Sequence, residues 1–394
     1  MNKSLVVGVL FVLLMATLSP IRAQDSVTFT KTPADVPVIA AGLAGVPVFM
    51  ADPVVYTDEE GLHLFYTSIF CEKAGQTYFS WNPANQDDCL LVSDSGATGY
   101  AFSADRGLTW TFRETPVIIP GPEEWDSEKV ETPFVTRVGD TVYLFYCATG
   151  DHDGKLFSLR YQIGVATLDL AGRSVKQAFL TDGDVMVKRP APLLAYNLAE
   201  PAADNNVQEP CVVFRDNSFE LYFIGLGLAL PDQGLDAPGQ GIESINFMRA
   251  TFDADLQPIS GPELLNSSVI VNMPEVHYRD GMYYLFYTTF NPTIDDDEFH
   301  HGEIVGYATS ADGLTWEDGG IILEPGESGA YDDWGLMAPT ASFQEDQTIL
   351  FYSAWGLSDH PAFPVQPDGR FGLPLSEDRT IYSNIGRAIS TTPL

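Results

Sequence analysis

The sequence predicts an all-β protein, a single five-bladed β-propeller, from its composition and from an internal repeat. Its 394 residues include 34 glycines, 27 prolines, 17 tyrosines and 24 phenylalanines, a composition typical of many short strands joined by tight turns. At five places a proline is followed eleven residues later by a Leu-aromatic-aromatic triplet. Antiparallel strands that repeat as one unit around an axis form a β-propeller.

Each repeat unit shows the same order of strands. An apolar strand begins at the proline, a polar turn follows, and the aromatic triplet marks a second strand, so the two predict a hairpin. The five prolines are Pro53, Pro133, Pro210, Pro274 and Pro339. A third strand is indicated by residues 99–103, 164–167, 248–251, 306–310 and 386–390. Segments such as residues 117–119 and 321–323 predict the fourth strand.

The last unit lacks a fourth strand because the sequence ends at Leu394, just after the third. Residues 29–33 resemble residues 112–116, which lie in the fourth-strand region of the first unit. We therefore expect residues 27–40 to complete the last blade and close the ring, which removes an exposed sheet edge. Residues 24–394 are expected to form one domain.

An apolar run at residues 5–18 follows Lys3 and precedes a small residue, Ala23. This pattern is typical of a secretory signal peptide over residues 1–23, and a membrane anchor needs a longer run of about twenty apolar residues. We expect an exported protein, secreted or periplasmic.

The charge of the chain argues against two classes of partner. Fifty-four acidic and 20 basic residues give a formal net charge of −34, which repels phosphate backbones and anionic lipid surfaces. We expect no nucleic-acid and no membrane partner, and a monomer.

The four cysteines divide into two pairs. Cys71 and Cys89 lie eighteen residues apart on one segment, and in an oxidising compartment a loop of that length favours a disulfide. Cys147 and Cys211 fall within apolar strands, where a cysteine behaves as a small buried hydrophobe. Neither has the spacing of a zinc site.

Motifs within the repeat resemble a known superfamily. They are Ala51-Asp52-Pro53, Glu209-Pro210 and the stretch at residues 306–316. A five-bladed propeller with these motifs resembles the glycoside hydrolases of families 43, 32, 68, 62, 117 and 130, and above all the family 43 arabinosidases and xylosidases. The resemblance implies a sugar-binding funnel at the axis, with carboxylates one or two residues before the blade prolines.

The same resemblance implies roles for individual residues. Asp52 falls where the superfamily has its base or nucleophile, and Glu209 where an aspartate orients the substrate and adjusts the pKa of the acid. Asn272 stands where the general acid is a glutamate, and an amide cannot give up that proton. The replacement donors we consider are Glu131 first, Glu275 second and His277 third.

The residues support this chemistry without the resemblance. Glycosidic cleavage usually needs one carboxylic acid and a second carboxylate. Asp52, Glu131 and Glu209 recur at equivalent strand starts, so a propeller brings them to one central well, where repulsion can hold one of them protonated. Four tryptophans outside the regular strands are candidates for the rim of the well: Trp81, Trp125, Trp334 and Trp355.

Other residues have simpler interpretations. Trp110 and Trp316 follow turn motifs and are expected to pack between strands, and Asp126 and Asp332, each seven residues before a blade proline, are expected to be matching turn residues. The acidic run at residues 295–298 is expected to be solvated, with calcium binding as the alternative. No cofactor is expected to be required.

The expected function is that of an exported glycoside hydrolase, inverting, that releases arabinose- or xylose-type units from poly- or oligosaccharides. A fructan hydrolase is the enzymatic alternative, although Ala51 and Val54 flank Asp52-Pro53 where that branch has asparagines. A sialidase is less favoured, because no cluster of three arginines is indicated. A propeller that binds carbohydrate without catalysis is the second alternative, if Asn272 marks a lost acid.

Overall fold

The structure is a computed structural model. It describes residues 27–41, 46–47, 49–73, 76–78, 90–121, 124–150, 161–196, 206–228, 242–290, 302–357, 373–376, 379–390 and 394. The predicted signal peptide, Trp81, Cys89 and the acidic run at 295–298 therefore lie outside the described residues. Within the described part of the chain, no helix is long and apolar enough to cross a membrane.

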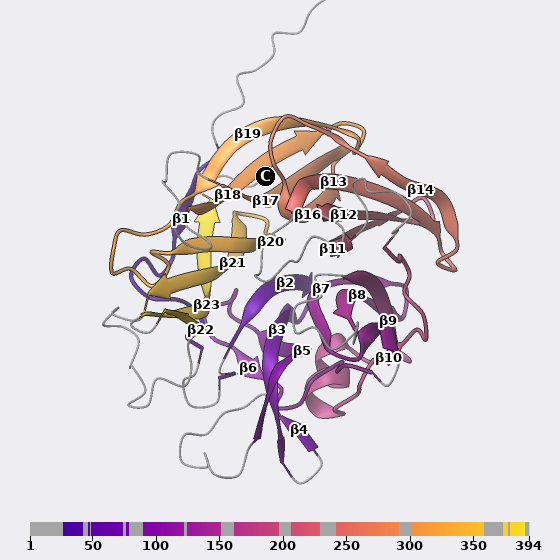
Figure 1. The fold of residues 1–394 in the computed structure, drawn as a ribbon, viewed down its shortest axis with the longest axis horizontal. Helices are drawn as coiled ribbons and strands as arrows, with labels where there is room; N and C mark the ends of the chain where they lie inside the picture. Colours follow the sequence, from indigo (N-terminus) through magenta and orange to yellow (C-terminus); the bar gives the residue numbers. More distant parts are fainter. Residues whose placement is uncertain are drawn as a thin grey trace, which may run out of the picture.

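Five antiparallel sheets, one for each repeat unit, are arranged around an axis, which confirms the predicted propeller (Figure 1). The first blade consists of β2 (Ala51–Asp58), β3 (Gly61–Lys73), β5 (Leu90–Ser103) and β6 (Thr111–Phe112), with β4 (Gln76–Tyr78) paired to β3. The second consists of β7 (Lys129–Val138), β8 (Thr141–Thr149), β9 (Gln162–Asp169) and β10 (Val187–Lys188). The third consists of β11 (Asn206–Arg215), β12 (Ser218–Leu228), β13 (Ile242–Asp253) and β14 (Pro258–Leu264).

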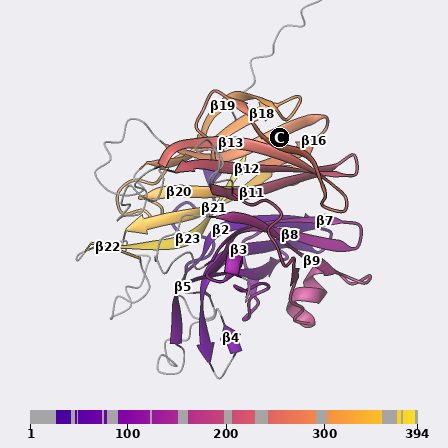
Figure 2. The same ribbon diagram turned by 45° about the vertical axis from the view of Figure 1, so that its right-hand side comes forward.

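The remaining blades follow the same order. The fourth consists of β16 (Asn272–Arg279), β17 (Met282–Phe290), β18 (Glu303–Ser310) and β19 (Thr315–Leu323), with β15 (Asn266–Ser267) paired to β19. The fifth consists of β20 (Gly335–Phe343), β21 (Thr348–Leu357), β23 (Arg379–Ser390) and β1 (Phe29–Lys31), with β22 (Leu373–Ser376) paired to β23. Two short helical segments, η2 (Glu124–Asp126) and η3 (Gln177–Thr181), belong to the second unit. The long β3–β5 hairpin, with β4, projects beyond the other blades (Figure 2).

The repeated glycine of the third strand makes room for a tyrosine of the second. A Cβ at Gly99, Gly164, Gly306 or Gly386 would lie 2.2–2.4 Å from the ring of the tyrosine paired opposite it. The third blade has Phe223 opposite Met248 instead. These tyrosines are fully buried, so the repeated Tyr–Gly pair is a packing unit between strands.

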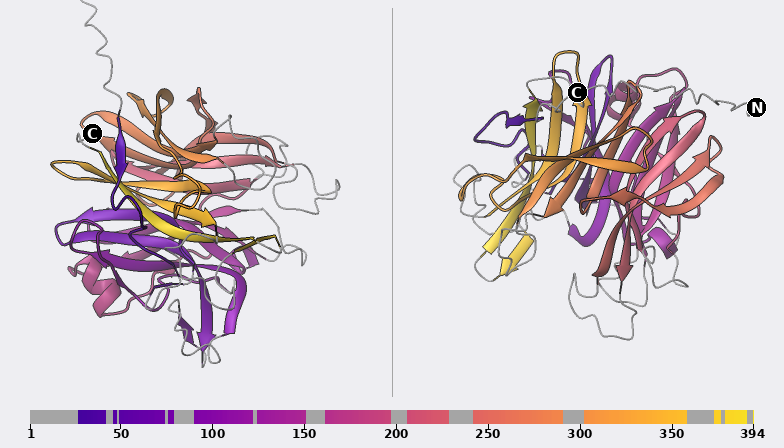
Figure 3. Two further views of the ribbon diagram at one scale, coloured as in Figure 1. Left: turned by 90° about the vertical axis from the view of Figure 1, so that its left-hand side faces the viewer. Right: turned by 90° about the horizontal axis from the view of Figure 1, so that it is seen from above.

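The N-terminal segment closes the ring, as predicted. Phe29 pairs with Ser390 and Lys31 with Ala388, which makes β1 the outer strand of the fifth blade (Figure 3). The Nζ atom of Lys31 lies 2.6 Å from a carboxylate oxygen of buried Asp332. The second blade repeats this ion pair between Lys188 of β10 and buried Asp126, at 2.7 Å.

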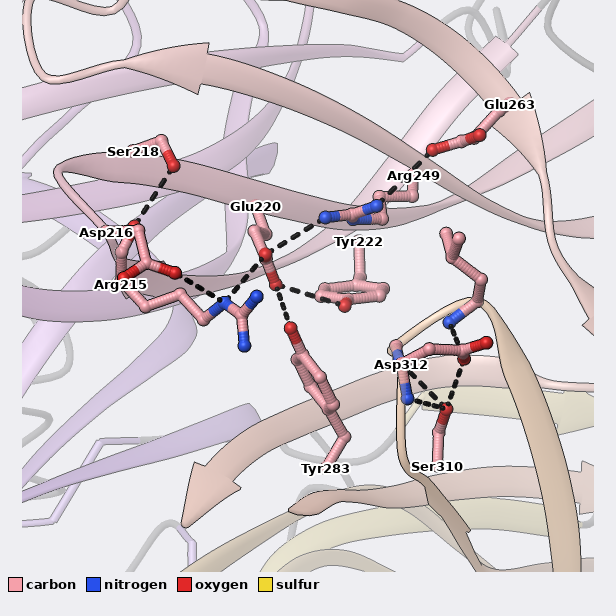
Figure 4. A network of polar contacts seen from close by, with 12 residues as sticks. Arg215, Asp216, Ser218, Glu220, Tyr222, Arg249, Glu263, Tyr283, Ser310 and Asp312 are labelled. Carbon is pink, nitrogen blue, oxygen red and sulfur yellow. Dashed lines mark hydrogen bonds and ion pairs between the residues drawn. The ribbon is translucent and has the colours of Figure 1, made fainter. Parts of the chain in front are cut away.

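A buried acid joins the third and fourth blades (Figure 4). The carboxylate of Glu220 contacts Arg215 at 3.1 Å and Arg249 at 2.9 Å. It also accepts hydrogen bonds from the hydroxyls of Tyr283 on the neighbouring blade, at 2.8 Å, and of Tyr222, at 3.3 Å. Two cations and two hydroxyls thus compensate one buried carboxylate, as burial of a charge requires.

Packing residues identified from the sequence are found in packing positions. Trp316 is buried against Tyr222 and Phe247, and Trp110 contacts Phe351 edge-on. Cys147 and Cys211 are buried and free, as expected. The Cys71–Cys89 pairing stays a prediction, because Cys89 lies outside the described residues.

Candidate active site

The innermost strand of every blade has a β-bulge at its proline. The residue before the proline adopts a left-handed φ angle in each case: 49° at Asp52, 47° at Thr132, 56° at Glu209, 45° at Met273 and 46° at Ala338. Such a conformation costs about 1–3 kcal/mol for a residue with a side chain and is found preferentially at functional sites. A bulge also re-aims the side chain away from the ordinary alternation of the strand.

Hydrogen bonds between blades hold four of the five bulges. In four blades the backbone N–H of the pre-proline residue donates to a side chain of the preceding blade. The pairs are Asp52 to Ser353 Oγ at 2.9 Å, Thr132 to Thr67 Oγ1 at 2.8 Å, Glu209 to Cys147 Sγ at 3.0 Å and Ala338 to Thr288 Oγ1 at 3.0 Å. All four acceptors directly follow an aromatic triplet. In the third blade that position is Ile224, which has no acceptor atom in its side chain. The buried thiol of Cys147 is thus part of this ring, a role that its apolar surroundings did not reveal.

The five pre-proline residues and their prolines line a cavity of about 40 Å³ at the propeller axis, which we call the axial well. Asp52 and Glu209 therefore share one cavity. Glu131 precedes the bulge of the second blade by one residue, and its charge acts on both of them. The structure thus brings together the three carboxylates that the repeat placed at equivalent strand starts.

The carboxylates of the axial well perturb one another. Burial and repulsion from Glu131 raise the pKa of Asp52 to about 7, although hydrogen bonds from the Thr67 side chain and the Thr132 backbone lower it. Burial and repulsion from Asp52 and Glu131 raise the pKa of Glu209 well above its ordinary value. Near neutral pH the group therefore holds at least one proton, as general acid catalysis requires.

Glu131 is held by a residue that the sequence analysis missed. The hydroxyl of Tyr161 donates a hydrogen bond to Glu131 Oε1. On its other side the carboxylate lies against Gly96 of β5, where a Cβ would be 3.1 Å from Oε2. Tyr161 precedes β9 and has no counterpart in the repeat, so no pattern in the sequence marks it.

Glu275 and His277 have different surroundings from the three carboxylates. The Glu275 carboxylate accepts hydrogen bonds from Thr340 Oγ1 and from the N–H of Ala341, both at 2.6 Å, and lies 3.0 Å from His277 Nε2. Glu275 lines both the axial well and a second axial cavity of about 330 Å³, which His277 also lines. These contacts connect the fourth and fifth blades.

The tryptophans expected at the rim fall into two groups. Trp334 and Trp355 are buried in a cluster with Met337, against which Phe49 and Met273 pack. Met273 also lines the axial well, so the cluster reaches the well from the fourth blade. Trp355 lies within β21 and not, as expected, outside the regular strands. Trp125 stacks on Tyr146 at 6.1 Å between ring centroids and donates its indole N–H to the Pro190 carbonyl at 3.1 Å.

Asn272 lies at the start of β16, partly buried and paired with Thr288. Within the described ranges, no group of three or more His, Cys, Asp or Glu side chains is arranged to hold a metal ion.

The fold and the axial carboxylates define a five-bladed propeller with an acidic central well. No protein-family profile and no curated protein sequence matches the chain. Among solved structures, it is similar to a thermostable family-43 glycoside hydrolase, with 16% identity, a TM-score of 0.55 and coverage of 91% of this chain and 92% of that one.

Two further structures share the fold. One is a GH43 β-xylosidase/α-arabinofuranosidase from a compost microbial metagenome in complex with xylotriose, with 15% identity, a TM-score of 0.51 and coverage of 89% and 93%. The other is an N-acetylgalactosamine deacetylase from F. plautii in complex with blood group B trisaccharide, with 14% identity, a TM-score of 0.53 and coverage of 90% and 94%. At these identities the likeness establishes the propeller fold.

Proposed function

We propose that the protein is a secreted glycoside hydrolase that cleaves poly- or oligosaccharides with the carboxylates around its axial well. The observation that carries the proposal is that Asp52 and Glu209 line one axial cavity, with Glu131 close enough for its charge to raise the pKa of both. Glycosidic cleavage uses one carboxylic acid and one carboxylate. Two solved structures of similar fold, one in complex with xylotriose and one with a trisaccharide, support a carbohydrate ligand.

The proposed reaction is inverting, with Asp52 as the base. In such a reaction one carboxyl protonates the leaving oxygen while the other takes a proton from the water that attacks the anomeric carbon. Arabinose- or xylose-type units are the proposed substrate, with support from the xylosidase/arabinofuranosidase of the same fold.

The second candidate is a propeller that binds carbohydrate without catalysis. It is favoured by Asn272, which stands where the resembling enzymes have their general acid. In that case the axial carboxylates would contact sugar hydroxyls and transfer no proton.

One experiment separates the two candidates. The secreted protein is incubated with aryl glycosides of arabinose, xylose, fructose and sialic acid, with the corresponding oligosaccharides and with an N-acetylated amino sugar. Released sugar and acetate are measured, and binding is followed by calorimetry. A hydrolase releases sugar from at least one pentoside, whereas binding without any release supports the second candidate.

We further propose that residues 1–23 are removed on export, that Cys71 and Cys89 form a disulfide, and that the mature protein is a monomer that requires no cofactor. N-terminal sequencing, peptide mass mapping without reduction, and light scattering test the first three. The absence of a required cofactor predicts unchanged activity after chelation. If chelation lowers the activity and calcium restores it, a metal site at residues 295–298 is supported.

A further inference from the structure

The three carboxylates of the axial well differ in the hydrogen-bond donors that they receive. Glu131 receives the hydroxyl of Tyr161, and Asp52 receives donors from Thr67 and Thr132. Among the described residues, no hydrogen bond to the Glu209 carboxylate is found, and only the backbone N–H of Glu209 is engaged, with Cys147 Sγ. The proton is therefore not shared equally among the three carboxylates.

We propose that Glu209 is the proton donor of the reaction and that Tyr161 is a positioning residue that holds the Glu131 carboxylate in place beside Asp52 and Glu209. This inference rests on the proposed hydrolase function. It exchanges the roles that the sequence suggested, in which Glu131 was the first candidate for the acid and Glu209 the residue that adjusts its pKa.

A donated hydrogen bond stabilises the ionised form of a carboxyl group, and burial without a donor stabilises the protonated form. Within the described ranges Glu131 has a donor and Glu209 has none, and burial with repulsion from Asp52 and Glu131 raises the pKa of Glu209 well above its ordinary value, which favours the proton on Glu209. Burial and the nearby charge of Glu131 raise the pKa of Tyr161 well above its ordinary value, so its hydroxyl stays protonated and remains the donor.

The contacts of Tyr161 also fix where Glu131 lies. The Tyr161 carbonyl accepts the N–H of Val207 at 3.2 Å, which ties the start of β9 to β11 of the next blade. The Glu131 carboxylate lies between the Tyr161 hydroxyl and Gly96. From this position its negative charge raises the pKa of both Asp52 and Glu209.

The protons of the reaction balance as follows. The Glu209 carboxyl gives its proton to the glycosidic oxygen as the bond from the anomeric carbon to that oxygen breaks. The Asp52 carboxylate takes a proton from water as the water oxygen bonds to the anomeric carbon. After product release, solvent returns the proton from Asp52 to Glu209, and Glu131 exchanges no proton with the substrate.

Carboxyl-carbon NMR locates the proton without reference to activity. Glutamate labelled at Cδ is incorporated, and the signals are assigned by their loss in Glu209→Gln and Glu131→Gln. We expect the Glu209 carboxyl to titrate well above the range of an exposed glutamate, because burial and repulsion from Asp52 and Glu131 raise its pKa. We expect Glu131→Gln to lower the Glu209 midpoint, because it removes one of the repelling charges. A Glu209 carboxyl that titrates like an exposed glutamate would overturn the proposal.

Kinetics with two leaving groups test the roles. Two glycosides of the same sugar are used, one with dinitrophenolate, which leaves without protonation, and one with an alkyl alcohol, which needs it. We expect Glu209→Gln to lower kcat/KM on the alkyl glycoside by about 10³-fold and on the dinitrophenyl glycoside by less than about tenfold, since general acid catalysis contributes about 10²–10⁴-fold. Glu131→Gln should affect both alike. Leaving-group dependence in Glu131→Gln instead would overturn the assignment.

Tyr161→Phe should move the acidic limb of the pH–rate profile, which reports Asp52, to lower pH, because Tyr161 no longer holds Glu131 where its charge raises the pKa of Asp52. Tyr143→Phe is the matched control, since Tyr143 lies on β8 of the same blade and packs against Phe219 away from the well. Equal profiles for the two variants would refute the positioning role. Failure of the proposed function gives a different result. The wild type would then cleave neither glycoside, while the NMR titration would still report which carboxyl carries the proton.

Discussion

Asp52 should destabilise the folded protein when it is ionised. Its pKa rises from 3.8 to about 7 on folding, through burial and repulsion from Glu131. A raised pKa means that the unfolded chain ionises first, so the penalty is absent below pH 4, grows between pH 4 and 7, and is complete above the folded pKa. At about 1.36 kcal/mol per pH unit, a shift of about three units corresponds to about 4 kcal/mol.

Replacing Asp52 by Asn should remove this penalty. For 394 residues, an unfolding entropy of about 2.1 cal/mol/K per residue converts about 4 kcal/mol into a rise in Tm of about 5 °C. The gain should be present at pH 8 and absent at pH 4. Thermal unfolding of wild type and variant, followed by circular dichroism at several pH values, measures it.

Asp58→Asn is the control of opposite sign. Burial alone would raise the pKa of Asp58, but the hydrogen bond and charge of His63, at 2.9 Å, lower it. This variant should therefore lose stability at neutral pH. Two results would contradict this account of Asp52 as a carboxylate that destabilises the fold when ionised. Either the Asp52→Asn variant is no more stable than wild type at pH 8, or it is stabilised equally at pH 4 and pH 8.

Three further predictions concern packing, closure and pH dependence. Gly306→Ala should lower the free energy of unfolding by about 1–3 kcal/mol, as overpacking does, because its Cβ would lie 2.4 Å from a buried tyrosine ring. Gly261→Ala is the control, since its Cβ would enter open space and the variant should be neutral in the same denaturant titration. Lys31→Ala should cost about 3 kcal/mol by leaving the buried Asp332 carboxylate without its cation, and hydrogen exchange should then accelerate first in β1; uniform exchange would contradict this. The acidic limb of kcat/KM should have its midpoint at about pH 7, the folded pKa of Asp52; a limb near pH 4 would exclude Asp52 as the base.

The fold could be predicted because every blade repeats the same local rules. The glycine opposite the buried tyrosine and the proline at the start of the inner strand recur with fixed spacing, and they report packing within one blade. The closing strand was predictable because residues 29–33 resemble residues 112–116 of the first blade, and β1 does pair with β23.

The site could be predicted only where it follows the repeat. Asp52, Glu131 and Glu209 meet because equivalent strand positions converge on the axis. Tyr161 has no repeated counterpart, so nothing in the pattern linked it to Glu131. The left-handed φ at Asp52 was also hidden, because that conformation is ordinarily a property of glycine.

Glu275 shows the same limit of prediction from the repeat. Its partners Thr340 and Ala341 lie on the next blade. Contacts of that kind depend on how blades face each other, which spacing along one strand does not specify.

The measurement that tests the central claim most directly compares wild type with Asp52→Asn on a cleavable pentoside. Initial rates give kcat, and calorimetry with the unhydrolysed oligosaccharide gives the Kd of the variant. The account predicts that kcat falls by about 10³-fold or more while Kd changes little, because the base acts in the transition state and contributes little to binding of the ground state. Turnover that is unchanged in Asp52→Asn would contradict it.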